Sequence, residues 1–241
     1  MPFSTGQMTH NLPAGIAVAG NKLEKLIGVH KFGYNATVGT SYETVWDGSN
    51  VYSDYNNSGA SLLLTSTSGA TDDTVKVTVE GLDSSWALTS EEFDIGPDGT
   101  ASGSETFKRV FRAFVSGDQA AAGTINITND AETETYAKIL PAYQQTQMAL
   151  YTIPAGHTGY ITSVEAGYSK NNEFEVMVMT KSLSPLGIFR TRAILSGYAG
   201  GLERKFEYPI VCPAGTDIQI RAKAGASGAV TAAFNLFIEK N

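Results

Sequence analysis

The fold class of this chain is decided by residues 75–80, VKVTVE. Apolar and polar residues alternate here with a period of two, which places the valines on one face of a β-strand and the polar side chains on the other. The same alternation recurs in residues 218–223 and 234–238. These runs predict half-buried strands that cover a hydrophobic core.

Segments rich in turn-forming residues separate the runs. Examples are NNSG at 56–59, GPDG at 96–99 and GASG at 225–228. Gly and Asn tolerate positive φ, and Asp and Ser close tight turns with their side chains. Short strands joined by frequent turns predict an all-β protein of the β-sandwich or jelly-roll type.

The chain length of 241 residues favours two modest domains. We place a first β-sandwich domain at residues 30–137, a linker at 138–147, and a second, jelly-roll-like domain at 148–241. Residues 1–29 are rich in small residues and poor in periodicity, so we expect an arm that crosses a surface. The predicted fold is therefore two tandem β-sandwich or jelly-roll domains preceded by an extended N-terminal arm.

One segment favours a helix, residues 21–27. Asn21 can cap it, and Leu23 and Leu26 fall on one face with Ile27. The expected helix has about two turns.

The charge pattern bears on partners and location. A net charge of -7, with no basic cluster larger than a pair, argues against nucleic acid. No run approaches the roughly 18 apolar residues of a membrane helix, and no basic residue precedes the apolar start, so we expect a soluble protein without a signal peptide or membrane partner. The lone Cys212 excludes an intrachain disulfide and fits a reducing compartment.

Sequence signatures of catalysis and of metal binding are missing. The histidines at 10, 30 and 157 are dispersed, and neither a nucleophile elbow nor a phosphate-binding loop occurs. Cys212 lies in an apolar strand, where a buried structural thiol is the favoured interpretation. We therefore predict no enzyme activity, no catalytic residues, no cofactor and no metal.

Exposed aromatic residues leave one alternative open. Tyr52 and Tyr55, flanked by Asp54 and Asn56, have the character of a loop that stacks on sugar rings. The favoured interpretation is that they anchor a strand end.

Two strands are apolar on both faces, residues 107–115 and 174–179. A strand of this kind is buried on both sides, either within its domain or against another subunit. Together with the apolar residues of the arm, they supply the predicted interface residues: Phe3, Met8, Leu12, Ile16, Val18, Phe111, Phe114, Met177 and Met179.

Several motifs point to one group of proteins. They include GVHKFGYN at 28–35, TVWDG at 44–48, FKRVFRA at 107–113, YTIPAGHTGY at 151–160 and KFEYP at 205–209. With these motifs the chain resembles structural proteins of tailed bacteriophages, notably marine ones, over most of its length from about residue 28. The motifs are strands and turns, and no active site is transferred with them.

The resemblance implies a virion component, assembled in the host cytoplasm. Among such components we favour a capsid decoration, or cement, protein that binds the major capsid protein and itself as a homotrimer. The alternatives are a neck, tail or fibre-base protein, a carbohydrate-binding module, and an esterase or lyase on a β scaffold.

Overall fold

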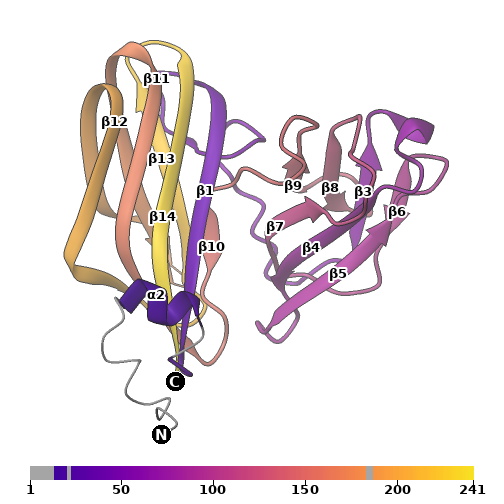
Figure 1. Ribbon diagram of the computed structural model, residues 1–241, viewed down its shortest axis with the longest axis horizontal. Coiled ribbons are helices and arrows are strands. Elements are labelled where there is room, and N and C mark those ends of the chain that lie inside the picture. Colours follow the sequence, from indigo (N-terminus) through magenta and orange to yellow (C-terminus); the bar gives the residue numbers. More distant parts are fainter. Residues whose placement is uncertain (1–13, 21–22, 183–186) are drawn as a thin grey trace, which may run out of the picture.

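The computed structural model describes residues 14–20, 23–182 and 187–241. The protein is all-β, as predicted, and its strands form two β-sandwiches that lie side by side (Figure 1). We call them the terminal sandwich, residues 26–46 and 148–241, and the inserted sandwich, residues 47–147.

The terminal sandwich is one continuous antiparallel sheet of seven strands that folds over on itself. The strand β11 makes this possible, because residues 157–168 pair with β14 and residues 174–181 pair with β13. Its hairpin partner β12 follows it throughout. The strands are β1 (Leu26–Val38), β2 (Glu43–Thr44), β10 (Leu150–Thr152), β11 (His157–Lys181), β12 (Arg190–Cys212), β13 (Asp217–Ala224) and β14 (Gly228–Lys240).

The inserted sandwich has two smaller sheets, with strand orders β6-β3-β8-β9 and β5-β4-β7. The alternation at residues 75–80 is confirmed, since Val77 and Val79 of β4 are fully buried between the sheets. The elements are β3 (Leu62–Ser66), the 3-10 turn η2 (Gly69–Asp72), β4 (Lys76–Leu82), β5 (Leu88–Asp94), β6 (Thr100–Ser102), β7 (Arg109–Val115), β8 (Ile125–Asn129) and β9 (Thr135–Ile139).

The order of the two units along the chain differs from the predicted tandem arrangement. Residues 30–38, which we assigned to the first domain, belong to β1, and β1 pairs with β14 near the C-terminus. The chain enters the inserted sandwich at Trp46 and returns at Met148, where the two residues form an antiparallel bridge. Of the predicted linker at 138–147, residues 138 and 139 belong to β9, and Gln144 and Thr146 hydrogen-bond to β7. Whether each unit folds independently stays a prediction.

The two hydrophobic cores share residues across the junction. Leu82 and Phe111 of the inserted sandwich lie in the core of the terminal sandwich, and Met148 and Leu150 lie in the other core. A buried ion pair joins the units at the same place. Arg109 Nε and Nη2 donate to the two carboxylate oxygens of Asp217, at 2.7 and 3.1 Å.

The start of the chain also differs from prediction. The helix α2 covers Ala14–Ala19. Of the predicted helix at 21–27, residues 21 and 22 lie outside the described residues, residues 23–25 form a turn, and Leu26 and Ile27 belong to β1. Propensity does not favour residues 14–19, which include Gly15, Ile16 and Val18, but packing does, because α2 buries Ala17 and Val18. The helix packs on β1, so part of the predicted arm lies against the terminal sandwich.

Candidate interaction surfaces

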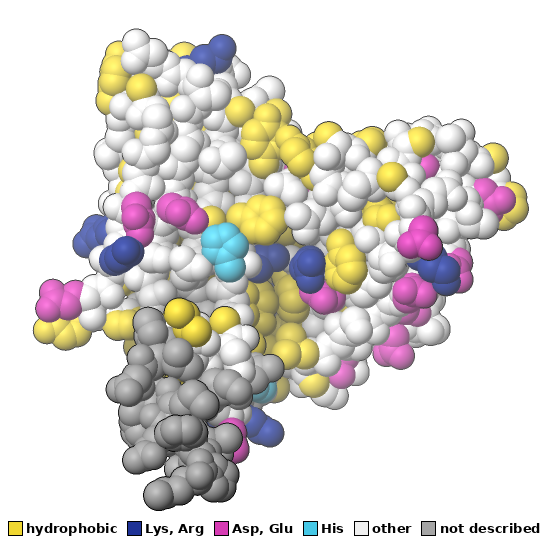
Figure 2. Space-filling view, in the orientation of Figure 1, with side chains coloured by type: hydrophobic (Ala, Val, Ile, Leu, Met, Phe, Trp, Pro, Cys, Tyr) yellow, Lys and Arg dark blue, Asp and Glu magenta, His cyan; other side chains and the backbone are white. Residues whose placement is uncertain are grey.

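A cleft of about 850 Å³ opens between the two sandwiches. Its walls come from β1 on one side and from β4, β5 and β7 on the other, and Figure 2 shows basic and apolar side chains together along this junction. Its lining includes His30, Lys31, Glu80, Leu88, Phe111, Arg112 and Tyr151.

Lys31 is the unusual residue of this cleft. It lies on β1 among the residues that face inward, and only 8% of it is exposed. Its Nζ donates a hydrogen bond to the Phe111 carbonyl and lies 5.8 Å from the centre of the Phe111 ring. Burial, aided by the nearby Arg112 charge and opposed by Glu80, lowers the pKa of Lys31 to about 7. In the structure the ammonium group has no ion-pair partner among the described residues.

A β-bulge explains why the Phe111 carbonyl is available to Lys31. Across β4 and β7, Glu80 pairs with Arg112 and Gly81 pairs with Val110, so Phe111 has no partner opposite. A bulged residue leaves the ladder, and its backbone groups need another partner. The lysine provides that partner. Arg112 and Glu80 form an ion pair of 3.2 Å on the cleft wall, next to the bulge.

The outer edge of β12 is the second surface. β12 has 23 residues and pairs on one side with β11, while its other edge has no strand partner in the described part of the chain. Exposed apolar side chains lie along it and in the segment before it. They are Ile188 (76% exposed), Ile194 (49%), Tyr198 (67%), Tyr208 (85%) and Val211 (50%).

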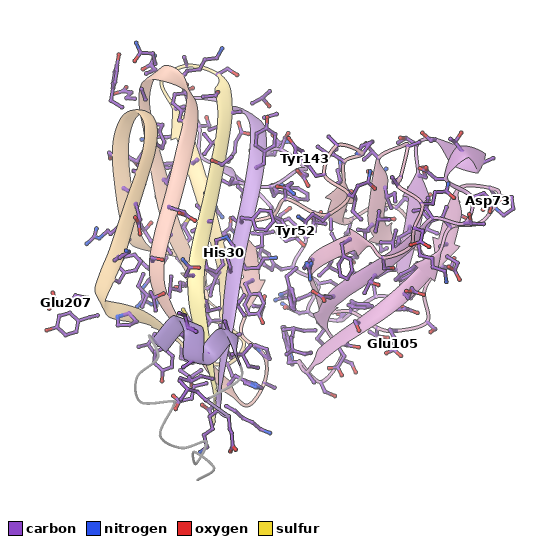
Figure 3. The ribbon with its side chains drawn as sticks, in the orientation of Figure 1. His30, Tyr52, Asp73, Glu105, Tyr143 and Glu207 are labelled. Carbon is purple, nitrogen blue, oxygen red and sulfur yellow. The ribbon has the colours of Figure 1, made fainter. Side chains whose placement is uncertain are left out.

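Part of this edge projects outward as a bulge. Ile210 pairs with Ile161 and Lys205 pairs with Ser163, so the four residues 206–209 oppose a single residue of β11. Figure 3 shows Glu207 projecting from the edge of the terminal sandwich. We call residues 206–209 the β12 bulge. Pro209 has no N–H, so it interrupts the row of donors that a free edge offers.

The predicted interface residues are dispersed over the molecule. Phe3, Met8 and Leu12 lie outside the described residues. The others are Ile16, exposed on α2; Val18, buried against β1; Phe111, buried at the cleft; Phe114, half-buried beside Arg112; Met177, half-buried; and Met179, buried. Their role in an interface stays a prediction. The apolar residues of β12 were missed, although Pro209 inside an alternating run indicates an edge strand or a bulge.

The structure tests two other hypotheses, the burial of Cys212 and sugar binding by Tyr52 and Tyr55. Cys212 is buried, as predicted, and burial raises the pKa of its thiol to about 12. Tyr52, in contrast, cannot stack on a sugar, because it is 3% exposed and its ring packs edge-on against Trp46. Tyr55 is also taken up by the protein, since its ring contacts the charged groups of Arg109 and Lys181.

Metal sites and membrane-spanning helices are absent from the described residues. In that part of the chain no three side chains of His, Cys, Asp or Glu come together in a way that would hold a metal ion. No described helix has the length and hydropathy required to cross a bilayer.

The buried amine leads to a prediction about pH. The pKa of Lys31 is about 7 in the folded protein and 10.5 as a model value, so the unfolded chain binds more protons between these pH values. Lys31 therefore costs stability as the pH falls from 10.5 to 7, in full about 5 kcal/mol. Replacing Lys31 by methionine removes that cost. It also leaves the Phe111 carbonyl without a hydrogen-bond donor, which lowers the free energy of unfolding by about 1–3 kcal/mol.

We expect Lys31→Met to raise the free energy of unfolding near pH 6–7 by about 1–3 kcal/mol, with an advantage that shrinks toward pH 9–10. Urea unfolding at several pH values measures this. Lys170→Met, at an exposed position of β11, is the matched control and should show no such pH dependence. A Lys31→Met protein that is less stable at every pH contradicts the interpretation.

The comparisons with known proteins are sparse. No family model and no curated protein matches the chain. Among solved structures it is similar to a chain of infectious bursal disease virus Gt strain, with 13% identity, a TM-score of 0.27, and coverage of 94% of this chain and 78% of that one.

Two other similar structures have different origins. The globular domain of zebrafish complement 1qA protein has 10% identity and a TM-score of 0.21, covering 67% of this chain and 94% of that one. An Arthrobacter globiformis isomalto-dextranase complexed with panose has 10% identity and a TM-score of 0.28, and the match covers 88% of this chain and 35% of that one. At TM-scores this low, none of these likenesses is an argument for a shared function.

Proposed function

We propose that this protein is a non-enzymatic structural component of a virion, and specifically a decoration protein that binds the exterior of a tailed-phage capsid as a homotrimer. The unpaired edge of β12 is the observation that carries the proposal. Monomeric proteins protect their edge strands with short length, charge or covering elements. β12 has charged residues and Pro209, but it is long, its outer edge is not covered by another strand in the described residues, and large apolar side chains are exposed along it.

The chemistry of this edge fits protein partners. Ile194, Tyr198 and Val211 are each about half exposed or more, and Tyr198 is of a residue type that is enriched at protein interfaces. Exposed apolar groups of this size on one edge are typical of association surfaces. The phage-like motifs in the sequence, among them residues 205–209 on β12 itself, support a virion as the setting.

Copy number in purified virions tests the proposal. We expect quantitative mass spectrometry to find this protein in an amount comparable with the major capsid protein, which serves as the internal reference in the same digest. Virions stripped of the protein should take it up again from solution. The variant with Ile194→Lys and Tyr198→Lys should bind poorly, because each lysine places a charge on the association surface.

Two outcomes would replace the proposal. A handful of copies per virion would identify a neck, tail or fibre-base protein, the second candidate. Absence from virions, together with a failure to bind capsids, would reject a structural role in the particle.

A further inference from the structure

The cleft between the sandwiches has more basic groups than acidic ones. Lys31 and Arg112 are basic, and Glu80 contributes the single carboxylate of the cleft lining, already paired with Arg112 at 3.2 Å, so that no carboxylate is left for a protonated Lys31. A buried charge without a counter-ion is costly, and proteins normally pair it. The cleft is thus suited to a ligand group that brings a carboxylate.

The apolar side chains of the cleft define the rest of the ligand. Leu88 is 51% exposed at the cleft, and Phe111 and Tyr151 pack together with ring centres 4.6 Å apart. Apolar surface next to a few well-placed polar groups is the usual composition of a binding pocket. An aromatic ring adjacent to a carboxylate would satisfy both features.

The β12 bulge presents this combination. Tyr208 is 85% exposed, the highest value among the exposed large apolar residues, and Glu207 next to it is exposed as well. Glu207 pairs with no lysine or arginine in the described residues. The bulge therefore offers an exposed carboxylate and an exposed ring in adjacent positions.

We propose that the cleft binds the β12 bulge of a second copy of this chain, with the Glu207 carboxylate against Lys31 and Arg112 and the Tyr208 ring over Leu88. The proposal rests on the self-assembly put forward above and assigns the surfaces that carry it. It also gives Lys31 a role: the lysine costs stability in the single chain and gains its counter-ion in the assembly. Such a trade-off is common at binding sites.

The geometry of the two surfaces determines the type of assembly. The bulge lies at the edge of the terminal sandwich, and the cleft lies at its junction with the inserted sandwich (Figure 3). Because the two surfaces differ, the contact is head-to-tail, and it forms a closed ring when the rotation between copies closes. The trimer is the ring that the proposed decoration role implies.

Three single substitutions test the contact by sedimentation of the full chain. Glu207→Gln and Tyr208→Ser should each weaken association at least about thirtyfold, as expected for a charged partner and an aromatic anchor. Lys31→Met should weaken association to a similar extent, and at dilutions where the wild-type protein is dissociated it should raise the midpoint of thermal unfolding. A lysine with a purely structural role would not move the two measurements in opposite directions. Glu105→Gln, at an exposed position of the inserted sandwich, is the control and should leave association unchanged.

Crosslinking tests the proximity directly. The paired variant Lys205→Cys with Ser90→Cys leaves Glu207, Tyr208 and Leu88 in place and, treated with a short bis-maleimide, should give covalent oligomers on a denaturing gel. Native Cys212 is buried and should not react. The control pairs Lys205→Cys with Glu105→Cys and should give little product.

The outcomes separate this inference from the proposed function. If the wild-type chain assembles and the substitutions at 31, 207 and 208 leave it unchanged, the contact is wrong and self-assembly stands. If the wild-type chain is monomeric at every concentration and on capsids, both are wrong.

Discussion

Replacing Asp217 by alanine is expected to lower the free energy of unfolding by about 3–5 kcal/mol. Asp217 is completely buried, and its carboxylate is held by Arg109, by Lys181 at 3.1 Å and by the Thr152 hydroxyl at 2.7 Å. The substitution leaves two cations without their counter-ion, one of them 3% exposed and the other 17%. Urea unfolding measures the loss.

The contacts of Arg109 prevent its side chain from moving into solvent when Asp217 is removed. Its guanidinium is held between Trp86 and Tyr55, at 4.8 and 5.0 Å, and it also donates to the Asn56 and Lys108 carbonyls. An arginine held this tightly cannot turn to water. Because it joins the two sandwiches, the loss should also loosen their junction.

A surface ion pair is the matched control for Asp217. Asp94 forms an ion pair of 3.0 Å with Lys76, and both side chains are well exposed, at 67% and 45%. Asp94→Ala should therefore cost less than about 1 kcal/mol. Equal effects at 94 and 217 would contradict the role assigned to the buried pair.

Gly33→Ala is expected to destabilise the protein by about 3 kcal/mol or more, because the site has no room for a Cβ atom. A Cβ at Gly33 would lie 2.2 Å from the Val45 carbonyl oxygen and 2.5 Å from the Ala149 nitrogen. These two atoms hydrogen-bond to each other at 3.0 Å, where the chain leaves for the inserted sandwich and returns. The added methyl group would break the hydrogen bond between Val45 and Ala149.

Thermal and urea unfolding of Gly33→Ala should show the effect. Gly39→Ala is the control, since a Cβ there meets nothing within 4 Å, and its stability should change by less than about 0.5 kcal/mol. If both variants retain wild-type stability, the backbone of Val45 and Ala149 can move to accept a methyl group at Gly33, which contradicts this account.

Local patterns in the sequence were enough to predict the strands. The alternation at 75–80 and at 218–223 depends only on which residues face a core, and the structure buries Val77, Val79, Ile218 and Ile220 as expected. Gln219 is the exception on β13, because the inserted sandwich covers its face and Tyr55 and Thr44 become its partners.

The arrangement of the units could not be predicted in the same way. β1 pairs with β14 across about 200 residues of chain, and period-two alternation carries no information on which strand pairs with which. The candidate surfaces depend on the same long-range contacts. In the sequence, Lys31 is an ordinary polar residue of a strand. Its burial depends on a contact with Phe111, which lies 80 positions away in the chain. The exposure of Tyr208 likewise follows from the bulge opposite β11.

The mass of the purified chain in solution tests the central claim, self-assembly, most directly. Light scattering after size-exclusion chromatography, over a range of concentrations, should give a mass near three times the 25.6 kDa chain. The mass of Tyr208→Ser should fall toward that of one chain at concentrations where the wild-type protein remains assembled. A wild-type mass of 25.6 kDa at every concentration, with no uptake by capsids, would contradict the account.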